Sequence, residues 1–117
     1  MPTLNELLHA SSRTFAVGID LLPPPLRSEV QTAYLLLRVS DYLEDNESME
    51  QTRKAALLQQ WAEVLGGQEG VAELERAIGP VQEQSPDALV ARNVARVTAA
   101  LEVLRPQARS LIRRHVR

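Results

Sequence analysis

Two aspartates four positions apart, Asp41 and Asp45, are the residues of this sequence best suited to chemistry. On an α-helix this spacing places both carboxylates on one face, one turn apart, with Glu44 beside them. Carboxylate oxygens suit Mg²⁺, which is commonly bound by one or two carboxylates together with substrate phosphates. The spacing therefore predicts a magnesium site that faces a phosphate-bearing ligand.

The two aspartates extend a polar stripe that begins with Tyr34 and Arg38. At 3.6 residues per turn, all four side chains fall within roughly 60° of the helix circumference. Most of the other positions are apolar: Ala33, Leu35, Leu36, Leu37, Val39 and Leu43. A helix that is apolar on nearly all sides is normally buried. We therefore expect the stripe to face an interior cavity or a partner, with its charges neutralised there.

Two interpretations of the stripe remain open. Arg38 can neutralise Asp41 three residues on, which would make the stripe an internal ion pair that keeps helices in register. However, Asp41 and Asp45 repel each other unless one is protonated or a cation lies between them. The second carboxylate favours a metal site.

A second polar group, Ser12-Arg13-Thr14 followed by Phe15, precedes the stripe. Hydroxyls and a guanidinium at the start of a helix favour anions, because free N–H groups and the helix dipole point toward them. Arginine can also bind phosphate with two hydrogen bonds. A helix cap followed by a surface arginine is the simpler interpretation. Taken together with the acidic stripe, this group indicates a diphosphate ligand.

Helix signals run through the N-terminal half of the chain. Thr3 and Glu6 form a capping box, which predicts a first helix from Leu4 toward Ala10. A second short helix is expected over residues 15–22. Three prolines at 23–25 then predict the start of a long helix that spans residues 26–45 and carries the stripe.

The C-terminal half also has helical spacing. Ser48 and Gln51 repeat the capping pattern before a helix that would bury Ala55, Leu58, Trp61, Ala62 and Leu65. A brief helix is expected over residues 71–78. One longer helix, capped by Asp87, is expected over 88–104, and Pro106 begins the last helix. The sequence thus predicts an all-α chain of about six helices.

Composition limits the class of protein. The 117 residues are 44% hydrophobic but only 3% aromatic and contain no cysteine, which fits one helical domain, or part of one, in the cytoplasm. No apolar run approaches the ~20 residues that span a bilayer. Seven arginines gather in residues 88–117 and nine acidic residues in 41–75. The overall balance is acidic and no aromatics alternate with the arginines, so nucleic-acid binding is not expected.

The segments SSRTFAVGIDLLPPPLR and AYLLLRVSDYLEDN resemble the N-terminal region of the squalene and phytoene synthase family. Members of this family are all-helical enzymes that join two prenyl diphosphates head to head. The resemblance is strong over residues 10–46 and is limited to helical character over 47–105. The closing LRPQARSLIRRHVR is similar to the lead-in to the family's next helix. The resemblance implies the N-terminal part of an isoprenoid-synthase-type helical bundle.

The resemblance also implies roles for residues of the stripe. Asp41 and Asp45 would hold Mg²⁺ on a substrate diphosphate. Tyr34 would line the reaction cavity near the ionising carbon, where its phenol could stabilise a cation or move a proton.

Further residues would bind the substrate. Ser12, Arg13 and Arg38 would contact the diphosphate, and Phe15 would belong to the prenyl pocket. NADPH would be needed only if the product were squalene. The resemblance leaves open whether the product is squalene-like or phytoene-like, and whether the protein associates with a membrane surface.

One family feature is missing from the sequence. Family members carry a second aspartate-rich motif on a later helix, whereas the only aspartate after Asp45 is Asp87, which is expected in a loop. Five or so other helices would also scarcely surround an almost wholly apolar helix. We therefore expect the chain to be a truncated family member, completed by the rest of the enzyme or by another chain.

Two other classes of protein remain as alternatives. All-α nucleotide pyrophosphohydrolases also bind Mg²⁺ with acidic helices, but they need paired glutamates that this sequence does not supply. A non-catalytic helical interaction module could instead dock its acidic stripe on a basic helix, including the arginine-rich C-terminus of this chain. His9 and His115 are expected at the surface, without a metal.

Overall fold

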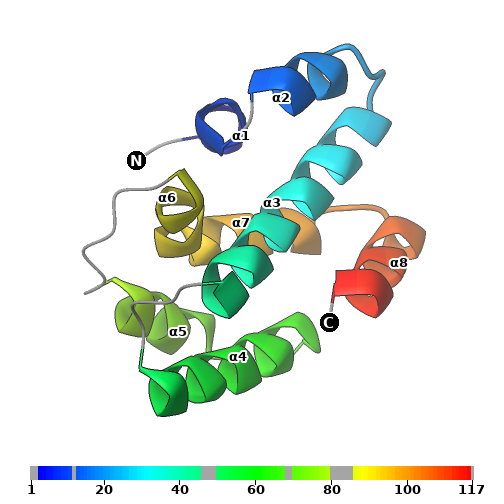
Figure 1. Ribbon diagram of the computed structural model, residues 1–117. Coiled ribbons are helices and arrows are strands. Elements are labelled where there is room, and N and C mark those ends of the chain that lie inside the picture. The colour runs from blue at the N-terminus through cyan, green and yellow to red at the C-terminus, as the bar shows by residue number, and fades with distance from the viewer. Residues whose placement is uncertain (1–2, 12, 46–49, 68–69, 80–85, 117) are drawn as a thin grey trace.

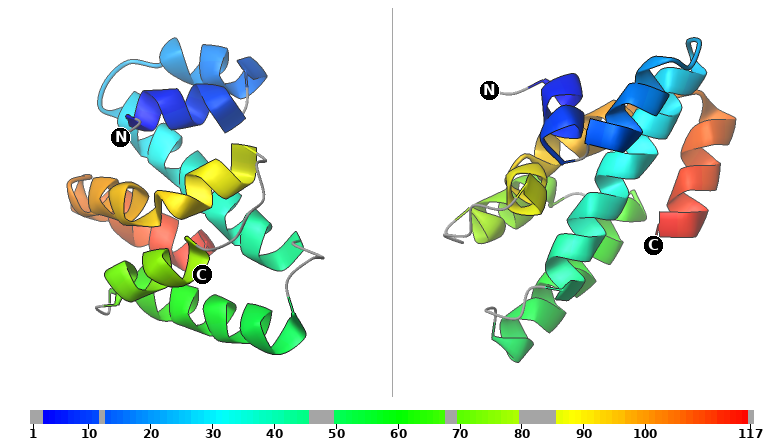
Figure 2. Two further views of the ribbon diagram at one scale, coloured as in Figure 1. Left: turned by 90° about the vertical axis from the view of Figure 1, so that its left-hand side faces the viewer. Right: turned by 45° about the horizontal axis from the view of Figure 1, so that its top comes forward.

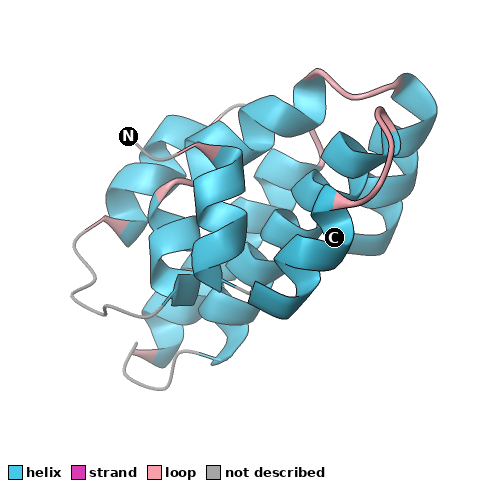
Figure 3. Cartoon of the chain, turned by 90° about the horizontal axis from the view of Figure 1, so that it is seen from above, coloured by secondary structure: helices cyan, strands magenta, loops and turns pink. Residues whose placement is uncertain are grey.

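The computed structural model describes residues 3–11, 13–45, 50–67, 70–79 and 86–116. Within these ranges the chain forms eight helices and no strand, where the sequence suggested about six helices (Figures 1 and 3). The helices are α1 (Leu4–Ser11), α2 (Arg13–Asp20), α3 (Leu26–Asp45), α4 (Gln51–Leu65), α5 (Val71–Ile78), α6 (Pro86–Arg92), α7 (Val94–Glu102) and α8 (Pro106–Val116). The all-α expectation is confirmed.

The long helix α3 lies at the centre of the fold and has the predicted bounds (Figures 1 and 2). It packs against α1, α2, α4, α6, α7 and α8. Leu35, Leu36, Val39 and Leu43 are completely buried along it. The neighbouring helices therefore cover more of α3 than the sequence suggested, although Leu37 keeps 45% of its surface exposed.

The N-terminal cap of α1 is the predicted one, whereas that of α4 differs from the prediction. Thr3 and Glu6 form the expected capping box, in which each backbone N–H donates to the other side chain at 3.1 Å. Ser48 lies outside the described residues. The described cap of α4 is Glu50, whose carboxylate accepts from two backbone N–H groups of the first turn.

The helix expected over residues 88–104 is in fact two helices, α6 and α7, which meet at Asn93. The Asn93 side-chain amide donates to the Leu89 carbonyl at 2.8 Å, and the Glu75 carboxylate accepts from the Ala95 N–H at the start of α7. These local bonds provide backbone partners that a continuous helix would otherwise supply. The expectation that Asp87 lies in a loop is also wrong, because it belongs to the first turn of α6.

Polar contacts join α3 to its neighbours. The Trp61 indole N–H of α4 donates to the buried Ser40 hydroxyl of α3 at 2.9 Å. At the other end of α3, Glu29 is only 6% exposed and accepts two hydrogen bonds from Arg105, at 2.6 and 2.7 Å. These bonds fix both ends of the helix that carries the stripe.

The buried face of α4 differs in part from the prediction. Trp61 and Leu65 are buried as expected, but Ala55 and Ala62 are exposed. Leu57 and Val64 are buried instead. Burial of a larger apolar side chain contributes more free energy than burial of alanine. In the part of the chain that the structure describes, no helix combines the length and apolarity needed to cross a bilayer.

Candidate diphosphate-binding site

Three residues of the predicted stripe are brought together on α3. A terminal nitrogen of Arg38, Nη2, lies 2.9 Å from Asp41 Oδ2. The same guanidinium lies over the Tyr34 ring, 5.2 Å from its centroid. The stripe is therefore a connected set in which the arginine bridges an aromatic face and a carboxylate.

Asp45, the second predicted metal ligand, is the last residue of α3 and is exposed. It lies one helical turn beyond Asp41, as the spacing requires. Among the described residues it takes part in no ion pair, so its carboxylate oxygens are accessible to a ligand.

The stripe is partly exposed. The Arg38 and Asp41 side chains are 32% and 40% exposed, respectively. The stripe was expected to face an interior cavity or a partner, and this exposure leaves its face accessible to a partner or ligand. One donor is nevertheless buried: Arg38 Nε has no hydrogen-bond partner among the described residues. The site is open to a ligand from solvent.

Asp87 is a member of this group that the sequence did not identify. Its Oδ1 lies 3.7 Å from Arg38 Nη1, which brings a carboxylate from α6 to the stripe on α3. Burial raises the pKa of Asp87, the Arg38 charge opposes that rise, and the charges of Asp41 and Asp45 add to it. Sequence spacing carried no signal for this contact, since it depends on how α6 packs against α3.

The upstream element is formed around the start of α2. Ser12 lies outside the described residues, and Arg13 and Phe15 are described only by their backbone, in the first turn of α2. Helix α2 packs against both α1 and α3. His9 on α1 lies 2.8 Å from Asp20 on α2, and both side chains are exposed, as expected for His9. The roles of Ser12, Arg13 and Phe15 remain predictions.

The carboxylates of the stripe could supply part of the ligand set of a magnesium ion, with the remaining ligands coming from phosphate and water. Within the described ranges, no group of three or more histidine, cysteine, aspartate or glutamate side chains is arranged to hold a metal. Mg²⁺ is often bound by one or two carboxylates, with phosphate oxygens and water as the other ligands. Asp41 and Asp45 match that requirement. The pKa of Asp87 is raised mainly by burial, and the nearby charges of Asp41 and Asp45 add to the rise.

An apolar groove of about 360 Å³ lies between α3 and α8. Its lining comes from Ala33, Leu37, Leu111, Ile112 and His115. Ala33 and Leu37 directly precede Tyr34 and Arg38, which places them about 100° around α3 from those residues. A charged stripe and an apolar groove therefore occupy neighbouring faces of one helix.

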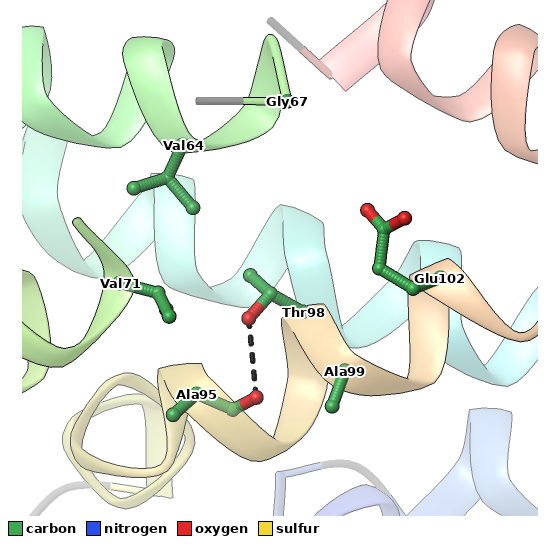
Figure 4. A pocket seen from close by; sticks show the side chains of 7 residues that line it. All are labelled: Val64, Gly67, Val71, Ala95, Thr98, Ala99 and Glu102. Atoms are coloured by element: carbon green, nitrogen blue, oxygen red, sulfur yellow. Dashed lines mark hydrogen bonds between the residues drawn. The ribbon is translucent and has the colours of Figure 1, made fainter. Parts of the chain in front are cut away.

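A second pocket of about 230 Å³ lies away from the stripe, among α4, α5 and α7 (Figure 4). Its lining includes Ala95 and Ala99 of α7 together with Val64 and Val71. The Thr98 hydroxyl donates within α7 to the Ala95 carbonyl at 3.1 Å. No residue of the stripe lines this pocket, so we do not assign the diphosphate to it.

Three arginines near the C-terminus, Arg105, Arg109 and Arg113, have described partners outside the stripe. Arg105 pairs with Glu29, and Arg113 pairs with Glu102 and donates to the Leu65 carbonyl. Arg109 donates to the Glu102 carbonyl. These three arginines are therefore not the ones that would dock on the acidic stripe in the same chain.

Comparison with known proteins matches most of the chain to one family model and about half of it to individual relatives. The family model described as squalene/phytoene synthase matches residues 8–117. The chain is 45% identical over 60 residues to a squalene synthase of Saccharomyces cerevisiae and 42% identical over 60 residues to one of Cyberlindnera jadinii. Each alignment covers 51% of this chain and 14% of the relative.

A squalene synthase of Botryococcus braunii is 41% identical over 58 residues, which cover 50% of this chain and 13% of the relative. The chain thus aligns with about one seventh of the length of the first two relatives. No solved structure matches the chain.

Proposed function

Because the chain belongs to the squalene/phytoene synthase family, we propose that it binds the diphosphate group of a prenyl diphosphate for head-to-head condensation of two such substrates. The observation that carries this proposal is the assembly of Tyr34, Arg38 and Asp41 on one face of α3, with Asp45 one turn beyond. Family membership indicates the class of reaction. The guanidinium and carboxylates of the stripe are suited to bind the diphosphate that leaves in such a reaction.

The side chains of the stripe suggest a separate role for each residue. Asp41 and Asp45 would hold Mg²⁺, which when bound stabilises the negative charge of the departing diphosphate. Arg38 would orient the diphosphate through its forked donors, including the buried Nε, which has no described partner. On the family resemblance, Ser12 and Arg13 would contact the same group.

The cation that remains after diphosphate departs needs a surface that excludes water and donates electron density. The Tyr34 ring, already beside a guanidinium, can face a cation in the same way. The apolar groove at Leu37 is next to the stripe and would take part of the prenyl chain, with Phe15 as a further contact. We propose a squalene-type or phytoene-type product, with NADPH required only for the former.

Calorimetry with a non-ionising farnesyl thiodiphosphate tests this proposal. We expect binding that requires Mg²⁺ and weakens at least tenfold in Asp41→Asn and Asp45→Asn. The matched control is Glu73→Gln, which removes one negative charge from another i,i+3 pair, formed with Arg76 at 3.4 Å. Binding that is equally tight without Mg²⁺, or unchanged in both aspartate variants, would show that these carboxylates are not metal ligands.

A further inference from the structure

Arg38 lies between two carboxylates that come from different helices. Asp41 on α3 holds Nη2 at 2.9 Å, which is hydrogen-bond distance. Asp87 on α6 lies 3.7 Å from Nη1, which is within ion-pair range but too long for a hydrogen bond. Helices α3 and α6 lie side by side in both views of the fold (Figures 1 and 2). The guanidinium is therefore within hydrogen-bond distance of Asp41 and only within ion-pair distance of Asp87.

The unequal distances matter when a divalent cation approaches Asp41. A carboxylate that turns toward Mg²⁺ binds Arg38 less well, because the metal and the guanidinium repel each other. Arg38 is only about one-third exposed, so water replaces a lost counter-charge incompletely. The guanidinium also lies over the Tyr34 ring, 5.2 Å from its centroid, and this attraction favours positions above the ring. A shift of less than about 1 Å toward Asp87 would make a normal charged hydrogen bond.

We propose that Asp87 is a positioning residue for Arg38, which receives the guanidinium when Asp41 turns to the metal. This inference rests on the proposed function, because it takes Asp41 as a ligand of Mg²⁺. Asp87 does not touch the metal in this account. It keeps Arg38 paired and aimed at the diphosphate while Asp41 changes partner.

Titration of the ¹⁵N-labelled chain with MgCl₂ tests the inference by NMR. The backbone amides of Asp41 and Asp45 report metal binding, and the Arg38 Nε–H signal reports the surroundings of the guanidinium. We expect Asp87→Asn to weaken Mg²⁺ binding about five- to tenfold, in the range of coupling between contacting groups. Asp87→Glu, which keeps the charge, should restore most of the affinity.

A double-mutant cycle separates positioning from a direct effect of charge. If Asp87 acts through Arg38, Asp87→Asn should change Mg²⁺ affinity less than about twofold when Arg38 is already glutamine. Glu73→Gln controls for the loss of one negative charge, and a thermal melt of each variant confirms folding. An equal loss in both backgrounds would overturn the inference, since Asp87 would then act directly on the metal. No loss in either background would also overturn it.

The same titration distinguishes failure of the proposed function. If Asp41→Asn binds Mg²⁺ as well as the parent does, or if the parent shows no binding at Asp41 and Asp45, both the metal site and the positioning role are refuted. If binding needs Asp41 but ignores Asp87, only the positioning role is refuted.

Discussion

Replacement of Asp41 by asparagine separates a metal ligand from a structural ion pair. The variant keeps the shape of the side chain but removes its charge. The Arg38–Asp41 pair has side chains 32% and 40% exposed, so its contribution to stability is reduced by solvent screening. Partly exposed pairs are worth about 0.2–1 kcal/mol, whereas removal of one partner of a fully buried pair costs ~3–5 kcal/mol. Asp87 remains close enough to offset part of the loss.

We therefore expect Asp41→Asn to lower the free energy of unfolding by about 0.5–1 kcal/mol, or Tm by roughly 2–5 °C for a chain of this size. Mg²⁺-dependent binding of the thiodiphosphate should fall at least tenfold in the same variant. Calorimetric melts and binding titrations on one protein preparation measure both quantities. A fall in Tm of more than about 10 °C with Mg²⁺-dependent binding unchanged would refute the metal assignment and leave the stripe as an internal ion pair.

Two further substitutions test the contacts that hold α3 in place. Ser40→Ala leaves the buried Trp61 indole N–H without its acceptor and should lower the free energy of unfolding by about 1–2 kcal/mol, measured by chemical denaturation. The control Ser28→Ala, at an exposed position, should lower it far less. Equal losses in the two variants would mean that the bond between Trp61 and Ser40 does not stabilise the fold. Hydrogen bonds from Arg105 lower the pKa of Glu29 below its ordinary 4.5, so the stability that they add is present above that pH and is lost on acidification. Glu29→Gln should therefore melt lower than the parent at pH 7 and converge with it well below pH 4.5; a gap that is independent of pH would contradict this.

Local signals in the sequence were enough for much of the fold. The prolines before Leu26 and the apolar spacing after it predicted a long helix that begins near Leu26, and α3 begins there. The capping box at Thr3 and Glu6 is also present. Both depend on neighbours within one or two turns, where steric exclusion and backbone hydrogen bonding dominate. The break at Asn93 was missed, because an asparagine within an apolar stripe looks compatible with a continuous helix until its side chain bonds to the backbone.

The candidate site was predictable only where it lies on one helix. Tyr34, Arg38 and Asp41 share a face by periodicity alone, and the structure places them in contact. Asp87 comes from a helix whose position depends on the packing of α6 against α3, so no spacing rule could assign it. The exposed fractions of Arg38 and Asp41 depend on the same packing of neighbouring helices. Periodicity shows which residues share a face, but tertiary contacts determine which face is covered.

The central claim is that Asp41 and Asp45 bind a divalent cation together with a diphosphate. Anomalous diffraction from crystals grown with Mn²⁺ in place of Mg²⁺ and with farnesyl thiodiphosphate tests it most directly. We predict a manganese peak roughly 2.0–2.3 Å from carboxylate oxygens of both aspartates, with the diphosphate between the metal and Arg38. An ordered diphosphate held by arginines alone, with no manganese at the end of α3, would contradict the claim.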